Sequence, residues 1–187
     1  MIKPEEKKLE VIKQKLSECR TLYNQLNYLE TIAKEDLDIA VKKFIYLKLV
    51  ELYVSKGMYD KAAKAMRGKA TLNTLYREVV EDYTKAGELY VKASLLENAE
   101  DMFNRALSEA NAQQAASIKL TMKNILFSHA KELESKHRTS AAVKFYEKIL
   151  RIPSLSPIEK EEIKTKLKGV YKSLGMFREL KMLDGSA

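Results

Sequence analysis

The amino-acid sequence predicts an all-α fold, a right-handed α-solenoid of about four antiparallel helical hairpins preceded by an amphipathic helix. Three observations predict it: small and aromatic residues share helical spacing in one segment, related segments occur on both sides of it, and turn residues separate the segments at similar intervals. The clearest segment contains Tyr83, Ala86, Gly87, Tyr90, Ala99, Phe103 and Ala106. Repeats of this kind stack to build one continuous core and one extended surface for partners.

Two weaker copies of this segment support the repeat. The upstream copy contains Tyr46, Leu49, Val50, Tyr53, Gly57, Tyr59, Ala62 and Met66. The downstream copy contains Leu126, Ala130, Leu133, Ala142, Tyr146 and Ile149. The expected turns at Gly57, Ser94, His137 and Gly175 lie 37, 43 and 38 residues apart.

Residues 1–36 carry an amphipathic stripe, whose members are Leu9, Ile12, Leu16, Cys19, Tyr23 and Leu26. Their steps of three and four residues predict either one long helix or a tight hairpin. The stripe either packs on the first repeat or forms a short coiled-coil seam with a second chain, so self-association through this segment is an open alternative.

The remaining residues divide into four expected helical pairs within a single domain, 1–187. These pairs span residues 37–70, 72–110, 113–152 and 157–184. We expect Thr71 to cap the first helix of the second pair and Ser94 to begin a capping box at its second helix. The strongest start signal is at residues 156–159, where an N-cap Ser, a Pro and a capping-box Glu follow one another.

The net charge of +8 is unevenly distributed. Residues 42–69 carry 8 Lys and Arg against 2 Asp and Glu, and residues 113–187 carry 15 against 8, which gives +6 and +7. Residues 70–112 between them carry 4 against 8, which gives −4. The basic blocks could attract a nucleic acid, an acidic protein or an anionic membrane surface, or they are simply solvated helix faces.

The single cysteine, Cys19, cannot form an intramolecular disulfide, so the chain needs no oxidising compartment. No stretch approaches the roughly 18 apolar residues of a membrane span. We therefore expect a cytoplasmic protein without a transmembrane segment.

With these offsets the chain resembles the tetratricopeptide repeat family, whose unit of about 34 residues carries a small residue on its first helix and an Ala, aromatic, Ala pattern on its second. Residues 83–106 match best, and the resemblance covers about residues 40–184. The longer spacing, together with residues 86–90 and 99–103, also looks like the soluble NSF attachment proteins, which bridge a helical bundle to an AAA ATPase in membrane fusion. The resemblance implies a protein-binding adaptor.

Some tetratricopeptide domains clamp a C-terminal carboxylate with Lys and Asn on their first helices. The matching positions are Leu47 and Glu51, Thr84 and Glu88, and Phe127 and Lys131. Because these residues do not form such a clamp, we expect a concave groove for an apolar or amphipathic partner helix instead.

The expected groove residues are Phe44, Leu47, Glu51, Glu88, Val91, Phe127 and Lys131, together with Val54. Glu51 and Glu88 would answer basic residues of the partner. Alternatively, the N-terminal helix covers the apolar members. Lys61, Lys64 and Arg67 should face outward on a second helix and form a basic patch.

No motif in the sequence points to catalysis, a metal or a cofactor. His129 and His137 are eight residues apart and need a third ligand to hold a metal. Gly-rich phosphate loops, nucleophile elbows and His-Glu metal motifs are absent. We expect a non-enzymatic scaffold that binds a partner protein. The alternative is nucleic-acid or acidic-partner binding through the blocks 42–69 and 113–187.

Overall fold

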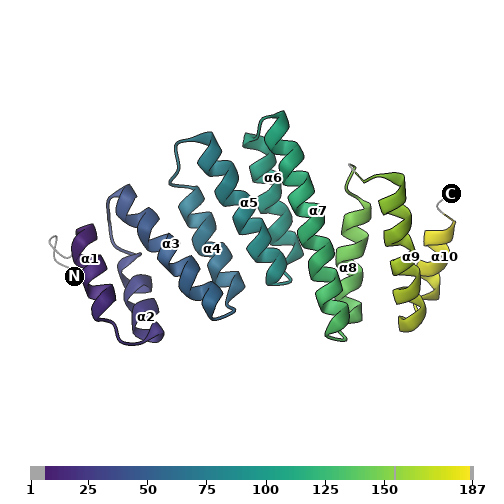
Figure 1. Ribbon diagram of the computed structural model, residues 1–187, viewed down its shortest axis with the longest axis horizontal. Helices are drawn as coiled ribbons and strands as arrows, with labels where there is room; N and C mark the ends of the chain where they lie inside the picture. The colour runs from purple at the N-terminus through teal and green to yellow at the C-terminus, as the bar shows by residue number, and fades with distance from the viewer. Residues whose placement is uncertain (1–6, 154, 186–187) are drawn as a thin grey trace. The chain divides into compact units, whose positions relative to one another are not determined.

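The computed structural model describes residues 7–153 and 155–185, and its secondary structure in these ranges is entirely helical (Figure 1). Each helix from α2 onward within a unit packs on the next helix in the sequence, which confirms the expected all-α, solenoid-like fold. The chain divides into two compact units, 1–111 and 112–187, and each is described by itself. Their membership of one domain stays a prediction.

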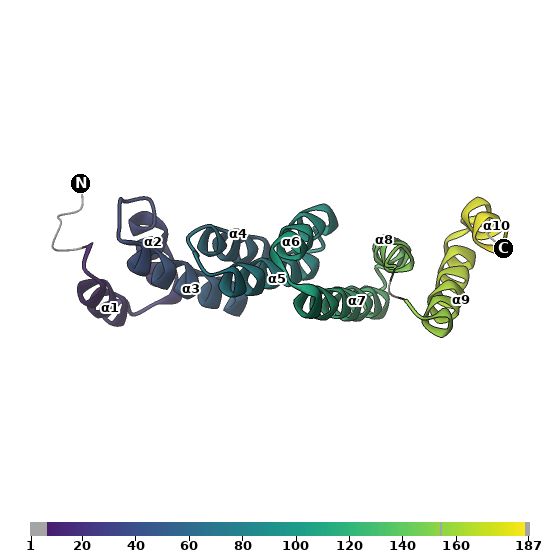
Figure 2. The same cartoon turned by 90° about the horizontal axis from the view of Figure 1, so that it is seen from above.

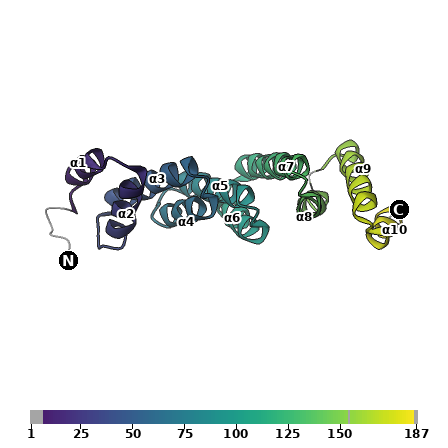
Figure 3. The same ribbon diagram turned by 90° about the horizontal axis from the view of Figure 1, so that it is seen from below.

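The first unit contains α1 (Leu9–Glu18), α2 (Leu22–Ile32), α3 (Ile39–Ser55), α4 (Tyr59–Ala70), α5 (Tyr76–Lys92) and α6 (Leu96–Glu109). Within this unit the helices form two layers: α1, α3 and α5 lie on one side, and α2, α4 and α6 lie on the other (Figures 2 and 3). We call the helices of the first layer first helices and those of the second layer second helices.

The N-terminal segment is broken into two helices rather than formed as one. The break falls at Cys19–Thr21, where the backbone of Cys19 is extended with φ −70° and ψ 106°. The Thr21 side chain accepts a hydrogen bond of 3.1 Å from the Asn24 amide and so caps α2.

The second unit contains α7 (Ala112–Ser135), α8 (Thr139–Leu150), α9 (Pro157–Leu174) and α10 (Phe177–Asp184). Ser156 begins α9 as expected. Its hydroxyl accepts from the Glu159 amide and its own amide donates to the Glu159 carboxylate, which completes the predicted capping box.

Four turns share one backbone geometry. Their central residues have positive φ: Gly57 at 68°, Ser94 at 60°, His137 at 57° and Gly175 at 69°. In each turn the next amide donates to a carbonyl five residues back, and these four bonds are Met58 to Tyr53, Leu95 to Tyr90, Arg138 to Leu133 and Met176 to Tyr171, at 2.8–2.9 Å. This is the Schellman hydrogen bond that ends a helix on a left-handed residue. The repeat is therefore visible in the backbone.

Two expected caps are wrong. Ser94 occupies the left-handed turn position, so α6 begins one residue later, after Leu95, without a side-chain cap. Thr71 ends α4 instead of starting α5, because α4 continues to Ala70 and α5 begins at Tyr76. Both signals are local, and each residue instead belongs to the end of the preceding helix, Thr71 as the C-cap of α4 and Ser94 as the left-handed residue after α5.

The helical pairs pack through small residues. Ala62 of α4, Ala99 of α6 and Ala142 of α8 each lie five residues after the left-handed turn residue and are fully buried. At Gly87 a Cβ would lie 2.9 Å from Cζ of Phe103, closer than real Cβ atoms approach. The close helix contact that the sequence predicts at Gly87 is confirmed.

Candidate partner-binding groove

The first unit contains a groove between α1, α2 and α3 that encloses about 460 Å³. Its apolar wall consists of Leu16, Leu29, Phe44 and Leu52. Its polar lining consists of Lys13, Ser17, Gln25, Lys48 and Glu51. An apolar floor with charged edges suits one face of an amphipathic helix.

Phe44 lies inside this groove and is half-buried. The Lys13 ammonium of α1 lies 5.9 Å from the centre of its ring. The N-terminal helix therefore shields part of Phe44, as the alternative interpretation of the sequence expected. Leu47 and Val54 on the same helix remain 40% and 37% exposed.

The two expected acidic residues lie on neighbouring first helices, each beside a lysine. Lys48 donates to exposed Glu51 at 2.6 Å, and Lys85 donates to half-buried Glu88 at 2.7 Å. Both are i,i+3 pairs at the surface, and such pairs contribute little to stability. A basic residue of a partner could replace the lysines at small cost.

Val91 is placed differently from expectation. Its side chain is fully buried, so it belongs to the core of the first unit and offers no surface to a partner. The reason is that α5 packs extensively on both α4 and α6, whereas α3 packs extensively on α4 but only weakly on α2, and its equivalent Val54 is partly open. Repeat register alone does not distinguish these two environments.

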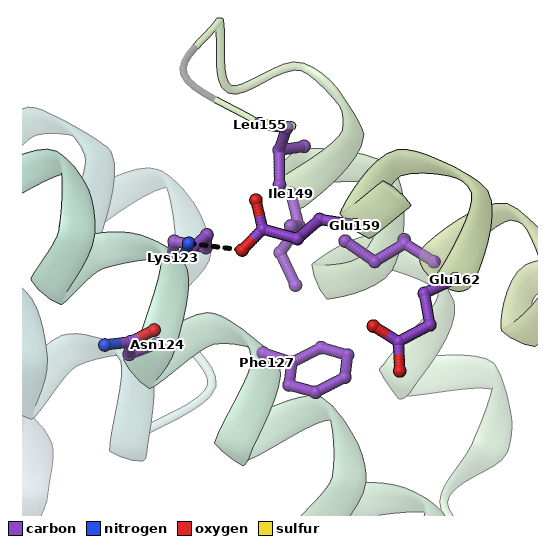
Figure 4. Close-up of a pocket in the computed structure, with 8 residues that line it drawn as sticks. Lys123, Asn124, Phe127, Ile149, Leu155, Glu159 and Glu162 are labelled. Carbon is purple, nitrogen blue, oxygen red and sulfur yellow. Dashed lines mark hydrogen bonds and ion pairs between the residues drawn. The ribbon is translucent and has the colours of Figure 1, made fainter. Parts of the chain in front are cut away.

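Phe127 and Lys131 belong to the second unit. The Lys131 ammonium lies 4.3 Å from the centre of the Phe127 ring, and that ring meets Tyr146 edge-on with 6.0 Å between centroids. Phe127 also borders a small pocket of about 100 Å³ between α7, α8 and α9 (Figure 4). The other lining residues are Lys123, Asn124, Ile149, Leu155, Glu159, Glu162 and Ile163. The seven expected groove residues are thus divided between two units.

An ion pair crosses this small pocket. Lys123 of α7 donates to Glu159 of α9 at 2.6 Å, the dashed contact in Figure 4. The hydrogen bond from Lys123, followed by those from Ser156, lowers the pKa of Glu159 to about 2. The carboxylate therefore stays ionised and joins two helices while it completes the cap of α9. The sequence predicted the cap but not Lys123, which is 36 residues away.

The expected basic patch is exposed on α4, but acidic neighbours reduce its charge. Lys61 lies 3.8 Å from Glu30, and Lys64 lies 3.7 Å from Asp60. Arg67 is also exposed. The patch is thus a mixed surface and not a purely basic one.

Sequence reasoning missed two sets of polar contacts between helices. The first comprises tyrosine hydroxyls that donate to glutamates of other helices, in the pairs Tyr53 with Glu30, Tyr146 with Glu134, and Tyr171 with Glu147. The second is the nearly buried carboxylate of Asp82, which accepts from both Lys69 and Asn73. A helical pattern marks these tyrosines as core residues and gives no signal for their polar partners.

In the described ranges, we find no group of three or more His, Cys, Asp or Glu side chains placed to hold a metal ion. Nor does any helix of those ranges combine the length and apolar character needed to cross a membrane.

No protein-family model matches the chain, and no curated protein matches it. Among solved structures, the crystal structure of BtubC (BKLC) from P. vanneervenii is similar with a TM-score of 0.41 and 18% sequence identity, over 92% of this chain and 74% of that one. A likeness this weak carries no argument about function, so the description of the fold rests on the helices themselves.

Proposed function

We propose that the protein is a non-enzymatic adaptor that binds an amphipathic helix or peptide segment of a partner protein on the first-helix surface of its first unit. The observation that best supports this proposal is the groove beside α3, whose apolar wall includes Phe44 and Leu52 and whose polar lining includes Glu51. Concave apolar surfaces with a few polar groups are the usual form of peptide-binding sites.

The exposed side chains suggest the chemistry of the partner. Apolar side chains at helical spacing would fill the groove and cover Leu47, which is 40% exposed. Lys or Arg residues of the partner would pair with Glu51 and Glu88, whose present partners are lysines on the same helices. Charge complementarity of this kind contributes to specificity and to the rate of association.

The resemblance of residues 83–106 to tetratricopeptide repeats supports the same proposal, because that family binds partner segments on its first helices. The looser resemblance to soluble NSF attachment proteins favours an adaptor in a trafficking-type assembly. The Gly87 contact with Phe103 and the four equivalent turns are consistent with both families.

The test begins with a helical peptide selected from a display library against the full chain. In the double variant Glu51→Lys and Glu88→Lys, the peptide should bind at least about tenfold more weakly by fluorescence anisotropy, which corresponds to about 1.4 kcal/mol. Circular dichroism should remain unchanged, because Glu51 is exposed, Glu88 is only half-buried and their present ion pairs are local.

The control is the triple variant Lys61→Glu, Lys64→Glu and Arg67→Glu, which changes charge on the second-helix layer. It should bind the same peptide with unchanged affinity. Loss of binding in the triple variant with retention in the double variant would contradict the proposed site.

A further inference from the structure

The junction between α1 and α2 connects two segments of one amphipathic stripe. The apolar period runs from Leu9 through Cys19 to Leu26 without a Gly or Pro. The structure breaks this stripe at Cys19–Thr21 and leaves Leu22 47% and Tyr23 70% exposed immediately after the break. A continuous helix would rejoin the two halves of the stripe.

The contacts that seat α1 on the first unit are few. α1 occupies a first-helix position, yet it has 10 residues where α3 and α5 have 17 each, and Ile12 is its one buried residue. It also lacks the left-handed turn that ends α3 and α5. At its N-terminal side, Lys7 pairs with Glu35 at 3.2 Å.

The surface of the first unit on which α1 packs, which we call its seat, contacts three side chains of this helix. Ile12 is fully enclosed, Leu16 lines the groove with Leu29 and Phe44, and Lys13 lies over the Phe44 ring. A helix with apolar residues at its fourth and eighth positions and Lys at its fifth therefore fits this surface. A second copy of the chain supplies that same helix.

We propose that the protein forms a helix-exchanged dimer, in which Cys19–Thr21 becomes helical, α1 and α2 join into one helix, and α1 takes the seat beside α3 of a second copy. A continuous helix points α1 away from its own α3, so its seat becomes free for the partner copy. Short hinges between an exchangeable element and its domain are the usual setting for such swapping. This inference shares Leu16, Leu29 and Phe44 with the groove of the proposed adaptor function, but it does not rest on that function.

The hinge at Cys19–Thr21 has two states, one in which α1 and α2 are separate and one in which they form a continuous helix. The Thr21 hydroxyl caps α2 by accepting a hydrogen bond from the Asn24 amide, and this cap stabilises the state with separate helices. Cys19 already has the extended backbone that the residue before a proline requires. Substitutions at residues 19–21 can therefore favour either state without touching the seat of α1.

The experiment measures dimerisation of the full chain by sedimentation velocity across a concentration series. The double variant Cys19→Ala and Thr21→Ala removes the cap and favours a continuous helix, so it should dimerise at a concentration roughly tenfold lower than the unmodified chain. Arg20→Pro should have the opposite effect, because proline inside a helix is strongly unfavourable. Equal dimerisation of both hinge variants would overturn the proposal.

A matched pair of α1 variants then tests whether the dimer uses the exchanged helix. Added to the double variant, Ile12→Glu places a charge in the enclosed seat and should abolish the dimer. Gln14→Glu places the same residue on the exposed face and should leave the dimer intact. A dimer that survives Ile12→Glu forms elsewhere and would refute the exchange. If Ile12→Glu unfolds the chain by circular dichroism, the response to Arg20→Pro alone decides.

Discussion

At the scale of single residues, Gly87 shows how closely the second helical pair is packed. A Cβ there would lie within 2.9–3.1 Å of three atoms of the Phe103 ring, and Phe103 is itself 1% exposed. Gly87→Leu should therefore destabilise the chain by roughly 1–3 kcal/mol, because the overpacked side chains must move. Urea unfolding followed by circular dichroism measures this loss.

Gly169 provides the matched control for that substitution. It is exposed within α9, and nothing lies within 4 Å of its ideal Cβ position. Gly169→Leu should stabilise the helix by somewhat less than about 1 kcal/mol, since leucine is a much better helix former than glycine. If Gly87→Leu unfolds at the same urea concentration as the unmodified chain, the close packing of Phe103 on Gly87 is refuted.

At the scale of elements, the four equivalent turns show the cost of a left-handed backbone at a residue other than glycine. Ser94 has a φ of 60°, in the left-handed region that non-glycine residues avoid. Ser94→Gly should raise the stability of the chain by about 1 kcal/mol, because glycine adopts this conformation without the steric penalty.

The reverse substitution, from glycine to serine, can be made at the equivalent turn of α3. Gly57 occupies the equivalent turn with a φ of 68°, and its Cβ position is open. Gly57→Ser should therefore lower the free energy of unfolding by a similar amount through the backbone alone. Thermal melts of both variants measure the two effects, and shifts of the same sign would contradict this account of the turns.

These elements also show what the sequence could predict. The turns at Gly57 and Gly175 follow from local chemistry, because glycine at a helix end favours the left-handed cap. For Ser94 the sequence predicts the right turn but also a helix start at that residue, since its spacing to Glu97 imitates a capping box. The break at Cys19–Thr21 could not be located, because a helical stripe passes through it and a single Thr cap decides it.

The candidate site was less predictable than the fold. Repeat register placed Leu47 and Glu51 at exposed positions of α3, where the structure also has them. It could not foresee that Val91 is enclosed, and it left open whether the N-terminal helix covers Phe44, because both depend on how neighbouring helices cover a surface. Pairs such as Lys123 with Glu159 are far apart in sequence and have no local signature.

At the scale of the whole molecule, the net charge of +8 allows nucleic-acid binding as an alternative function. Many lysines in the two basic blocks already pair with carboxylates. Examples are Lys61 with Glu30, Lys123 with Glu159 and Lys168 with Asp184. These pairs reduce the charge that remains for phosphate groups.

Salt dependence distinguishes the two functions. The affinity for the selected helical peptide should change by less than about threefold between roughly 50 and 200 mM salt, because apolar burial is insensitive to screening and the two surface ion pairs contribute little. A nucleic-acid complex with six or more phosphate contacts would weaken by roughly a thousandfold over this range. Tight binding of duplex or single-stranded nucleic acid with such a steep salt dependence would favour the alternative.

The hydrogen bonds from Tyr53, Tyr146 and Tyr171 to glutamates should make the ultraviolet absorbance of the chain report its folding in alkaline solution. Burial, and then the hydrogen-bonded carboxylate, raises the pKa of each phenol above its usual value of 10.0. Because the folded-state pKa is the higher one, these bonds stabilise the chain fully below pH 10 and are lost as the pH rises further. The chain has ten tyrosines and no tryptophan, so tyrosinate absorbance follows both ionisation and the accompanying loss of structure.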